Sequence, residues 1–234
     1  MLDVDGTLYH QDPLRFLMAL ELSALPLVRR SYGSASRVWR SLRCFRRVRE
    51  ELRFVGALKS SLADLQYVET AKRAGVNSAE IEQVVAEWIY RRPLKYLRFC
   101  KRHGIEQLFA FLERNKIQIG VFSDYPVADK LRALGLSRSI TLMLCATDPD
   151  INAFKPHPKG FLRACAIWGL IPEEVLYIGD RPEVDAPGAA AVGMPCAIIA
   201  RKLGRQMYNN RSTDYSVISS FGDLYHAFTT DVRC

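Results

Sequence analysis

Two aspartates stand two residues apart near the start of the chain, in the segment Asp3-Val4-Asp5-Gly6-Thr7. At the end of an extended strand, residues two apart point the same way, so both carboxylates can face one substrate. Gly6 permits a tight turn directly beyond them. Two carboxylates at one site need a counter-charge, and oxygen ligands alone suit Mg²⁺. One carboxylate can then act as a nucleophile while the other donates and accepts protons.

A second acidic pair, Asp180 and Asp185, lies far along the chain, and other polar groups lie between the two pairs. Ser123 can hydrogen-bond a phosphoryl oxygen, helped by the backbone N–H of Asp124, and Lys155 can supply a fixed positive charge. Two aspartates at this spacing, taken alone, are equally compatible with a solvated turn. The second pair and the lysine favour a reactive site.

The elements that must position these groups alternate between two kinds after about residue 100. Short apolar runs at 117–122, 140–144, 175–178 and 196–200 predict strands, and the segments 105–114, 127–134, 160–168 and 184–192 predict helices. Such alternation predicts a parallel sheet covered on both faces, with reactive groups at the carboxyl ends of its strands. Asp3, Ser123 and Asp180 each follow such an end.

The preceding segment is helical and basic. Residues 11–102 carry a net charge of +10, and the rest of the chain carries −2. Apolar spacing predicts one helix over 36–55, with Trp39 and Phe45 near its buried stripe. A second helix is expected to begin at Ser78 as the capping residue and to end or bend at Pro93. The outer face of the first helix is expected to carry the arginines at positions 37, 40, 43, 46, 47 and 53. The segment 29–36 is the expected loop.

The segments DVDGT, VFSD, FKPHP with its lysine, and GDRPEVD occur in this order. They resemble the four motifs of the haloacid dehalogenase-like hydrolase superfamily, and they span Asp3 to Asp185. The insertion of about 90 residues between the first two motifs is similar to the helical cap of the subfamily that includes phosphoglycolate phosphatases. The resemblance implies a Rossmann-like, three-layer α/β core at residues 1–9 and 97–234, and an inserted α-helical cap at residues 10–96.

The resemblance also implies a role for each motif residue. Asp3 would attack phosphorus and form an aspartyl-phosphate, Asp5 would be the general acid and base, and Lys155 would neutralise the reacting oxygens. The implied phosphoryl-binding residues are Thr7, Ser123, Asp124 and Lys155. The implied Mg²⁺ ligands are Asp3, Asp5 through its carbonyl, and Asp180, with Asp185 as a second ligand or as an acceptor for the metal's waters. Pro13 and Arg15 are the cap residues nominated to contact substrate.

The expected function is Mg²⁺-dependent hydrolysis of a small phosphate monoester. Loss of a halide needs no proton, so the presence of Asp5 favours ester hydrolysis over dehalogenation. Three alternatives stay open: a phosphomutase that uses the same acids, a nucleic-acid end phosphatase that uses the basic cap, and a non-catalytic protein that binds a phosphate ligand. Cys145 is expected to be a buried thiol because no base is positioned to activate it.

Composition limits the remaining classes. The chain of 234 residues is 49% hydrophobic and 25% charged, as in ordinary folded proteins. It has no apolar run long enough to span a membrane and begins with acidic residues where a signal peptide would be basic, so we expect a cytoplasmic monomer or homodimer that binds a small phosphorylated metabolite. A nucleic-acid partner is disfavoured. Only two residues precede Asp3, fewer than a strand needs, and we expect a start further upstream.

Overall fold

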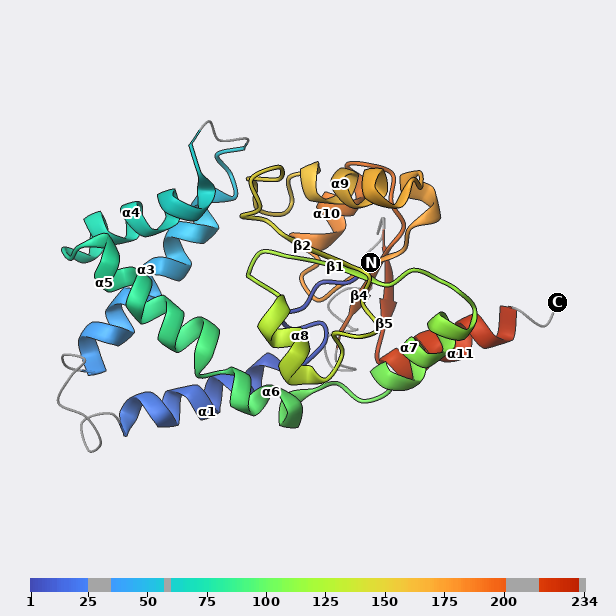
Figure 1. Cartoon of the computed structure of the whole chain (residues 1–234), viewed down its shortest axis with the longest axis horizontal. Helices are drawn as coiled ribbons and strands as arrows, with labels where there is room; N and C mark the ends of the chain where they lie inside the picture. The colour runs from blue at the N-terminus through green and yellow to red at the C-terminus, as the bar shows by residue number, and fades with distance from the viewer. Residues whose placement is uncertain (25–34, 57–59, 201–214, 232–234) are drawn as a thin grey trace.

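Parallel strands form a sheet that runs through the middle of the molecule (Figure 1). The computed structural model describes residues 1–24, 35–56, 60–200 and 215–231. Its strands are β1 (Gly120–Ser123), β2 (Leu142–Cys145), β3 (Tyr177–Gly179), β4 (Cys196–Ile199) and β5 (Ser216–Ile218). β1 pairs with β2, and β4 pairs with both β3 and β5. Leu2 forms parallel bridges to Val121 and Ile178, so the segment before Asp3 lies between β1 and β3.

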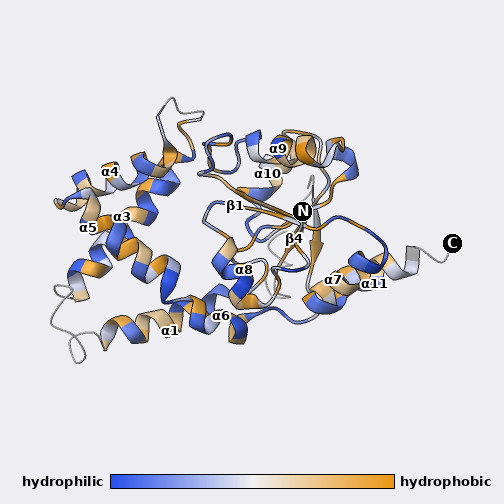
Figure 2. Ribbon diagram, in the orientation of Figure 1, coloured by the Kyte–Doolittle hydropathy of each residue, from blue (hydrophilic) through white to orange (hydrophobic). Residues whose placement is uncertain are grey.

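Both faces of strands β1, β3 and β4 are buried. Successive strand residues point to opposite faces, so Val121 and Ile178 belong to one apolar cluster while Phe122 and Tyr177 belong to another. The first cluster includes residues of α7 (Ile105–Arg114), α8 (Ala128–Leu134) and α11 (Phe221–Asp231). The second includes residues of α9 (Lys159–Trp168) and α10 (Asp185–Ala190). Apolar residues therefore dominate the strands, as the orange segments beside the β1 and β4 labels in Figure 2 show.

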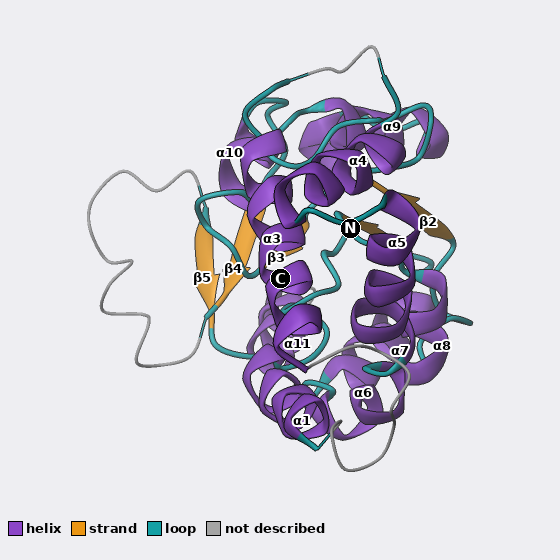
Figure 3. Cartoon of the chain, turned by 90° about the vertical axis from the view of Figure 1, so that its left-hand side faces the viewer, coloured by secondary structure: helices purple, strands orange, loops and turns teal. Residues whose placement is uncertain are grey.

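A separate group of helices lies to the left of the sheet in Figure 1, and Figure 3 views the molecule from that side. It consists of α1 (Gln11–Ser23), α3 (Ala35–Leu52), α4 (Leu62–Ala74), α5 (Ser78–Val85) and the π-helix η1 (Ala86–Arg91). α6 (Leu94–Cys100) returns the chain to the sheet. Leu42 and Trp88 meet in one small apolar cluster of this group, and Phe45 and Ile81 meet in another.

The two connections between the helical group and the sheet run side by side. Tyr9 pairs with Lys101 in an antiparallel bridge, and the N–H of His10 donates to the carbonyl of Cys100 at 2.8 Å. The chain therefore leaves the sheet and returns to it at the same place. No helix in the described ranges is long and apolar enough to cross a membrane.

The α/β class with a parallel sheet is confirmed, and several details differ from expectation. β1, β2 and β3 begin two or three residues after the apolar runs do, because residues such as Ile140 and Val175 are buried by packing before strand pairing begins. β5 was not expected, since it has three residues and none of them is fully buried.

The helical details also differ in three places. Asn77, not Ser78, caps α5, because the Asn77 side chain accepts the N–H of Glu80 at 2.7 Å. Trp39 is 51% exposed and therefore lies outside the core, whereas Phe45 is buried as expected. Of the expected loop at 29–36, residues 29–34 lie outside the described ranges, and the last two residues belong to α3.

The packing of α9 against the sheet generates a stability prediction. A Cβ atom at Gly160 would lie 2.1 Å from the ring of Phe122, which is fully buried. We expect Gly160→Ala to lower the free energy of unfolding by about 1–3 kcal/mol through overpacking. Gly222→Ala in α11 is the matched control, because its Cβ would meet only Ser220 Oγ at 3.4 Å. Urea denaturation of both variants measures the difference, and equal midpoints would contradict the prediction.

Candidate active site

A buried lysine joins two aspartates at the carboxyl ends of the central strands. Lys155 Nζ lies 2.8 Å from Asp3 Oδ1 and 2.6 Å from Asp185 Oδ1. It also donates to the hydroxyl of Tyr177 at 2.8 Å. Lys155 is 3% exposed, Asp3 is 5% exposed and Asp185 is 1% exposed. Because a buried ion without a partner costs several kcal/mol, these contacts hold three distant segments of the chain together.

The carboxylates of this cluster outnumber its positive charge. Burial raises the pKa of Asp3 to about 7, and the neighbouring Lys155 only partly opposes that rise. Burial and the charge of Asp3 raise the pKa of Asp180 to about 8. Burial alone would lower the pKa of Lys155, but the charges of Asp185 and Asp3 raise it well above its ordinary value. The cluster therefore has room for a further cation on electrostatic grounds.

The carboxylate of Asp180 is placed to hold such a cation. Its Oδ1 is buried and has no hydrogen-bond partner among the described residues. A Cβ atom at Gly6, where φ is +94°, would lie 2.0 Å from Asp180 Oδ2, so only glycine lets this carboxylate approach the Asp5 turn. Within the described ranges, no three His, Cys, Asp or Glu side chains form a metal-binding group. Mg²⁺ suits one or two carboxylates supplemented by water, and the residues present fit it in that way.

Asp185 accepts hydrogen bonds with both of its carboxylate oxygens. Oδ1 accepts the Lys155 ammonium and also the Tyr177 hydroxyl at 3.2 Å. Oδ2 accepts the backbone N–H groups of Asp180 at 3.1 Å and Arg181 at 3.0 Å. This bonding fixes the loop that carries Asp180. It favours a positioning role for Asp185 over direct metal ligation.

Asp5 lies beside Ser123 in a different set of contacts. Ser123 Oγ is 3.4 Å from Asp5 Oδ2, Lys130 Nζ is 2.6 Å from both Asp5 oxygens, and the Tyr9 hydroxyl donates to Oδ1. Thr7 Oγ1 is buried and has no hydrogen-bond partner in the part of the chain that is described. A carboxylate and two hydroxyl groups thus lie on the turn and strand end next to Asp3.

Lys130 was not among the residues expected at the site. It lies on the inner face of α8 with Leu131 and Leu134, both buried, and is itself 5% exposed. A lysine within an apolar helical stripe directly after the VFSD segment is a sequence signal that could have identified it. The sequence pattern alone does not identify the ion-pair partner of Lys130, because Asp5 is 125 positions away.

The Asp124 side chain is bonded within the protein, and the role expected for this residue involves its backbone N–H. Oδ1 accepts the backbone N–H of Lys155 at 3.1 Å, and Oδ2 accepts Arg53 Nη1 at 2.5 Å. Burial would raise the pKa of Asp124, yet the charges of Lys155 and Arg53 hold it below its ordinary value. The carboxylate therefore fixes the loop of Lys155. A contact from Asp124 to a phosphoryl group can involve only its backbone N–H.

Two arginines at the end of α3 point inward, which corrects the expectation for Arg53. Arg53 Nη1 bonds the carbonyl of Lys155 at 2.7 Å as well as Asp124, and it is 9% exposed. Arg49 is fully buried, donates to the carbonyl of Asp124 at 2.7 Å and stacks 3.9 Å from the ring centroid of Tyr125. The remaining arginines of the outer face, at positions 37, 40, 43, 46 and 47, are exposed as expected. The last turn of α3 contacts the core, so its arginines are covered.

The same turn of α3 reaches a third core loop. Glu50 accepts Arg181 at 3.1 and 3.2 Å, next to Asp180 in the loop after β3. Residues in the last turn of α3 and just beyond it thus bind the loops that follow β1, β2 and β3. We call Arg49, Glu50 and Arg53 the α3 clamp.

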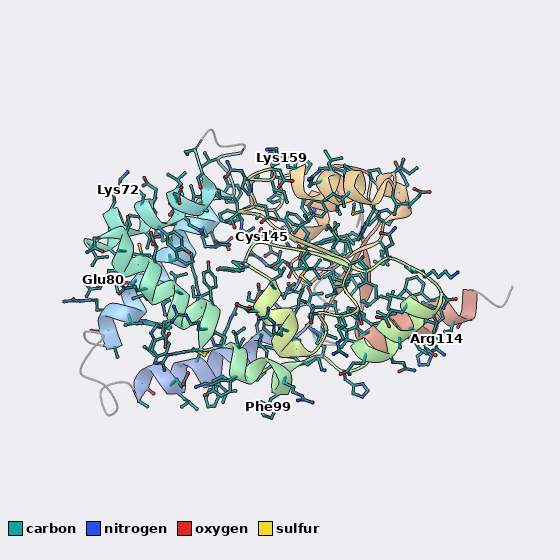
Figure 4. The ribbon with its side chains drawn as sticks, viewed as in Figure 1. Lys72, Glu80, Phe99, Arg114, Cys145 and Lys159 are labelled. Carbon is teal, nitrogen blue, oxygen red and sulfur yellow. The ribbon has the colours of Figure 1, made fainter. Side chains whose placement is uncertain are left out.

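Three other nominated residues stay outside this site. Cys145 lies at the end of β2, on the side that faces the helical group (Figure 4). Burial raises the pKa of its thiol, in agreement with the expected inert cysteine. Pro13 and Arg15 are exposed on α1, and Arg15 bonds Gln11 of the same helix.

Comparison with known families places these residues in context. A model of the haloacid dehalogenase-like hydrolase family matches residues 1–193. The phosphoserine phosphatase of Thermus thermophilus is 32% identical over 103 residues, which are 44% of this chain and 39% of that protein. The phosphoglycolate phosphatase of Photorhabdus laumondii is 30% identical over 123 residues, which are 51% of each chain. The chain spans about half the length of these relatives, or less.

Solved structures share the fold over nearly the whole chain. A 2-haloacid dehalogenase from Pseudomonas syringae has a TM-score of 0.65 at 21% identity, over 98% of this chain and 96% of that chain. A HAD-hydrolase from Bacillus subtilis bound to magnesium has a TM-score of 0.66 at 17% identity, over 97% and 96%. These likenesses confirm the expected Rossmann-like core with inserted helices.

The buried ion pair of the α3 clamp leads to a prediction. Arg53→Met leaves the Asp124 carboxylate buried without its guanidinium partner, so we expect the free energy of unfolding to fall by about 3–5 kcal/mol. Arg47→Met, on the same helix, breaks an exposed pair with Glu51 and should cost less than about 1 kcal/mol. Chemical denaturation of both variants measures the two losses. A loss for Arg53→Met as small as that for Arg47→Met would show that the clamp does not stabilise the fold.

Proposed function

The chain belongs to the haloacid dehalogenase-like hydrolase family, and we propose that it hydrolyses a small phosphate monoester with the help of Mg²⁺. The observation that carries the proposal is the buried contact between Lys155 and Asp3 at 2.8 Å, next to a second aspartate that Ser123 approaches. The relatives named phosphoserine phosphatase and phosphoglycolate phosphatase support the same reaction class.

In the first step, a carboxylate oxygen of Asp3 attacks phosphorus. The bond from phosphorus to the ester oxygen breaks, Asp5 gives a proton to that oxygen, and the alcohol leaves. Lys155 stabilises the negative charge on the transferring group, and the hydroxyls of Ser123 and Thr7 are placed to donate to its oxygens. The product is a phosphoryl group bonded to Asp3.

In the second step, water releases the phosphoryl group from Asp3. Asp5, now ionised, takes a proton from the water as its oxygen attacks phosphorus. The bond from phosphorus to Asp3 breaks and inorganic phosphate forms, which leaves Asp3 as a carboxylate and Asp5 protonated, as at the start. Asp3 thus forms its bond to phosphorus in the first step and loses it in the second, and Asp5 acts first as an acid and then as a base.

Asp3 and Asp180 would hold the Mg²⁺ ion, together with the backbone carbonyl of Asp5. When bound, Mg²⁺ supplies positive charge that stabilises the phosphoryl oxygens. The raised pKa values of Asp3 and Asp180 support this assignment, as does Asp180 Oδ1, which has no hydrogen-bond partner within the described ranges. Asp185 contributes by fixing the loop through the N–H groups of Asp180 and Arg181.

Asp5 distinguishes ester hydrolysis from the dehalogenation that the descriptions of several structural neighbours name. A halide leaves without a proton, whereas an ester oxygen needs one. The carboxylate of Asp5 lies within 3.4 Å of the Ser123 hydroxyl, so an acid is available beside the expected phosphoryl position. This placement supports a phosphate ester as the substrate.

Burial of the site supports a small substrate. Asp3, Ser123 and Lys155 are 5%, 1% and 3% exposed, and the α3 clamp covers the loops that carry two of them. We propose that residues 10–96 act as a cap on a core of residues 1–9 and 97–234, and that opening of the cap admits the ester. Closure would exclude water until the ester is in place. The exposed arginines of α3 would attract the anionic substrate.

The nucleophile assignment predicts a large loss of activity. We expect Asp3→Asn to reduce phosphate release from para-nitrophenyl phosphate, in the presence of Mg²⁺, by at least about a thousandfold, because the amide cannot form the covalent intermediate. Asp150→Asn, at an exposed carboxylate paired with Arg163, is the control and should retain the wild-type rate. Wild-type rates for Asp3→Asn, or full wild-type activity in excess chelator, would refute the proposed function.

The raised pKa values predict a pH-dependent effect of Mg²⁺ on stability. Asp3 and Asp180 keep protons in the folded, metal-free chain that they lose when unfolded, so its free energy of unfolding should fall as pH rises from about 4 to about 8. Mg²⁺ binds the ionised forms of the two carboxylates. The increase in the protein's melting temperature on adding Mg²⁺ should therefore be larger at about pH 8.5 than at about pH 5.5.

Thermal unfolding with and without Mg²⁺ measures this effect, and Asp180→Asn should remove most of it. Asp150→Asn again serves as the control, because it removes an exposed carboxylate outside the site. An equal shift at both pH values, or an unchanged shift in Asp180→Asn, would contradict the metal assignment.

A further inference from the structure

Lys130 lies next to the proposed acid–base residue and has no role in the reaction steps given above. It extends from α8 into the interior and is 5% exposed. Its neighbours on the inner face of the helix, Leu131 and Leu134, are 0% and 1% exposed. An ammonium group in such surroundings is strongly unfavourable unless a charged partner accompanies it. The position therefore needs an explanation beyond the packing of α8.

The partner of Lys130 is Asp5, and the contact is bidentate. Nζ lies 2.6 Å from Oδ1 and 2.6 Å from Oδ2, which restricts rotation of the carboxylate about its own axis. The Tyr9 hydroxyl donates to Oδ1 as well. Burial and the nearby charge of Asp5 raise the pKa of Tyr9 well above its ordinary value, so this hydroxyl keeps its proton at neutral pH.

The ammonium group itself is held by an aromatic ring. Lys130 Nζ lies 4.9 Å from the ring centroid of Tyr125, which is the residue that Arg49 of the α3 clamp also stacks against. A cation near an aromatic ring is stabilised by the ring's quadrupole. Asp5 is thus fixed by Lys130 and Tyr9, and Lys130 is fixed by Tyr125. These contacts join α8, the turn after Asp3 and the loop after β1.

We propose that Lys130 and Tyr9 are positioning residues that orient Asp5 for proton transfer to the leaving oxygen. The inference rests on the proposed phosphatase function. As the bond from phosphorus to the ester oxygen breaks, that oxygen takes the proton of Asp5, and Asp5 becomes a carboxylate. The bonds from Lys130 and Tyr9 are those that a carboxylate accepts, so they hold Asp5 in place and stabilise the charge that it gains.

The effect should depend on the leaving group. In para-nitrophenyl phosphate the departing oxygen is stable as an anion and needs little help from an acid, whereas in phenyl phosphate it needs a proton. We expect Lys130→Met to lower kcat/KM by about a hundredfold for phenyl phosphate and by less than about tenfold for para-nitrophenyl phosphate. A loss of folded enzyme would lower both values equally, so the ratio of the two separates positioning from stability.

The test compares kcat/KM for both esters, with Mg²⁺, in the wild type, Lys130→Met, Tyr9→Phe and Lys72→Met. Lys72 is 65% exposed at its side chain and pairs with Glu69 on α4, so Lys72→Met should change neither value. Tyr9→Phe keeps the ring, removes the donated hydrogen bond and should shift the ratio in the same direction by a few fold. It carries the test if Lys130→Met does not fold.

The outcomes separate this inference from the proposed function. If the wild type hydrolyses both esters and Lys130→Met changes the ratio, the inference is supported. If the wild type is active but the folded variants lower both esters equally, or neither, the inference is wrong and the phosphatase proposal stands. If the wild type hydrolyses neither ester, the proposed function fails and the inference fails with it.

Discussion

The arrangement of the whole site depends on one buried ammonium group. Lys155 comes from the loop after β2, Asp3 follows the segment between β1 and β3, and Asp185 begins α10 after β3. Their side chains meet where water is excluded, so each charge depends on the others for compensation. The parallel sheet is what brings three strand ends to one edge. The lysine then determines how closely those ends can approach.

That compensation is incomplete, and the imbalance links stability to chemistry. Asp180 adds a carboxylate that Lys155 does not bond, and burial together with the charge of Asp3 raises its pKa to about 8. A protein selected for stability alone would replace such a group with an apolar one. The loss of stability that these buried charges cause is confined to the edge of the sheet where the polar residues of all three loops gather. Strained or undercompensated groups of this kind are characteristic of functional sites.

The sequence was sufficient to predict strands β1 to β4 and the strand ends that carry the motif residues, because both depend on local patterns, whereas the short, partly exposed β5 gave no such pattern. Apolar runs and helical periodicity specify the elements, and strand ends specify where Asp3, Ser123 and Asp180 gather. The inward direction of Arg49 and Arg53 could not be predicted in this way. Their helix has two partners, the other inserted helices and the core, and periodicity identifies only one buried stripe. Lys130 was missed for a related reason, since its partner is distant in sequence.

The adjacent entry and exit of the helical group have an evolutionary consequence. Because Tyr9 pairs with Lys101, the helical group is joined to the core by two adjacent backbone segments. A different insertion could join the same two segments without altering the order of the strands. Recognition of the proposed ester substrate could then diversify while the proposed reaction is conserved. The α3 clamp limits that freedom, because any replacement must supply a new partner for the buried carboxylate of Asp124. The chain topology would allow the helical group to be exchanged for another insertion, but the buried charge of the core loops restricts which insertions would fit.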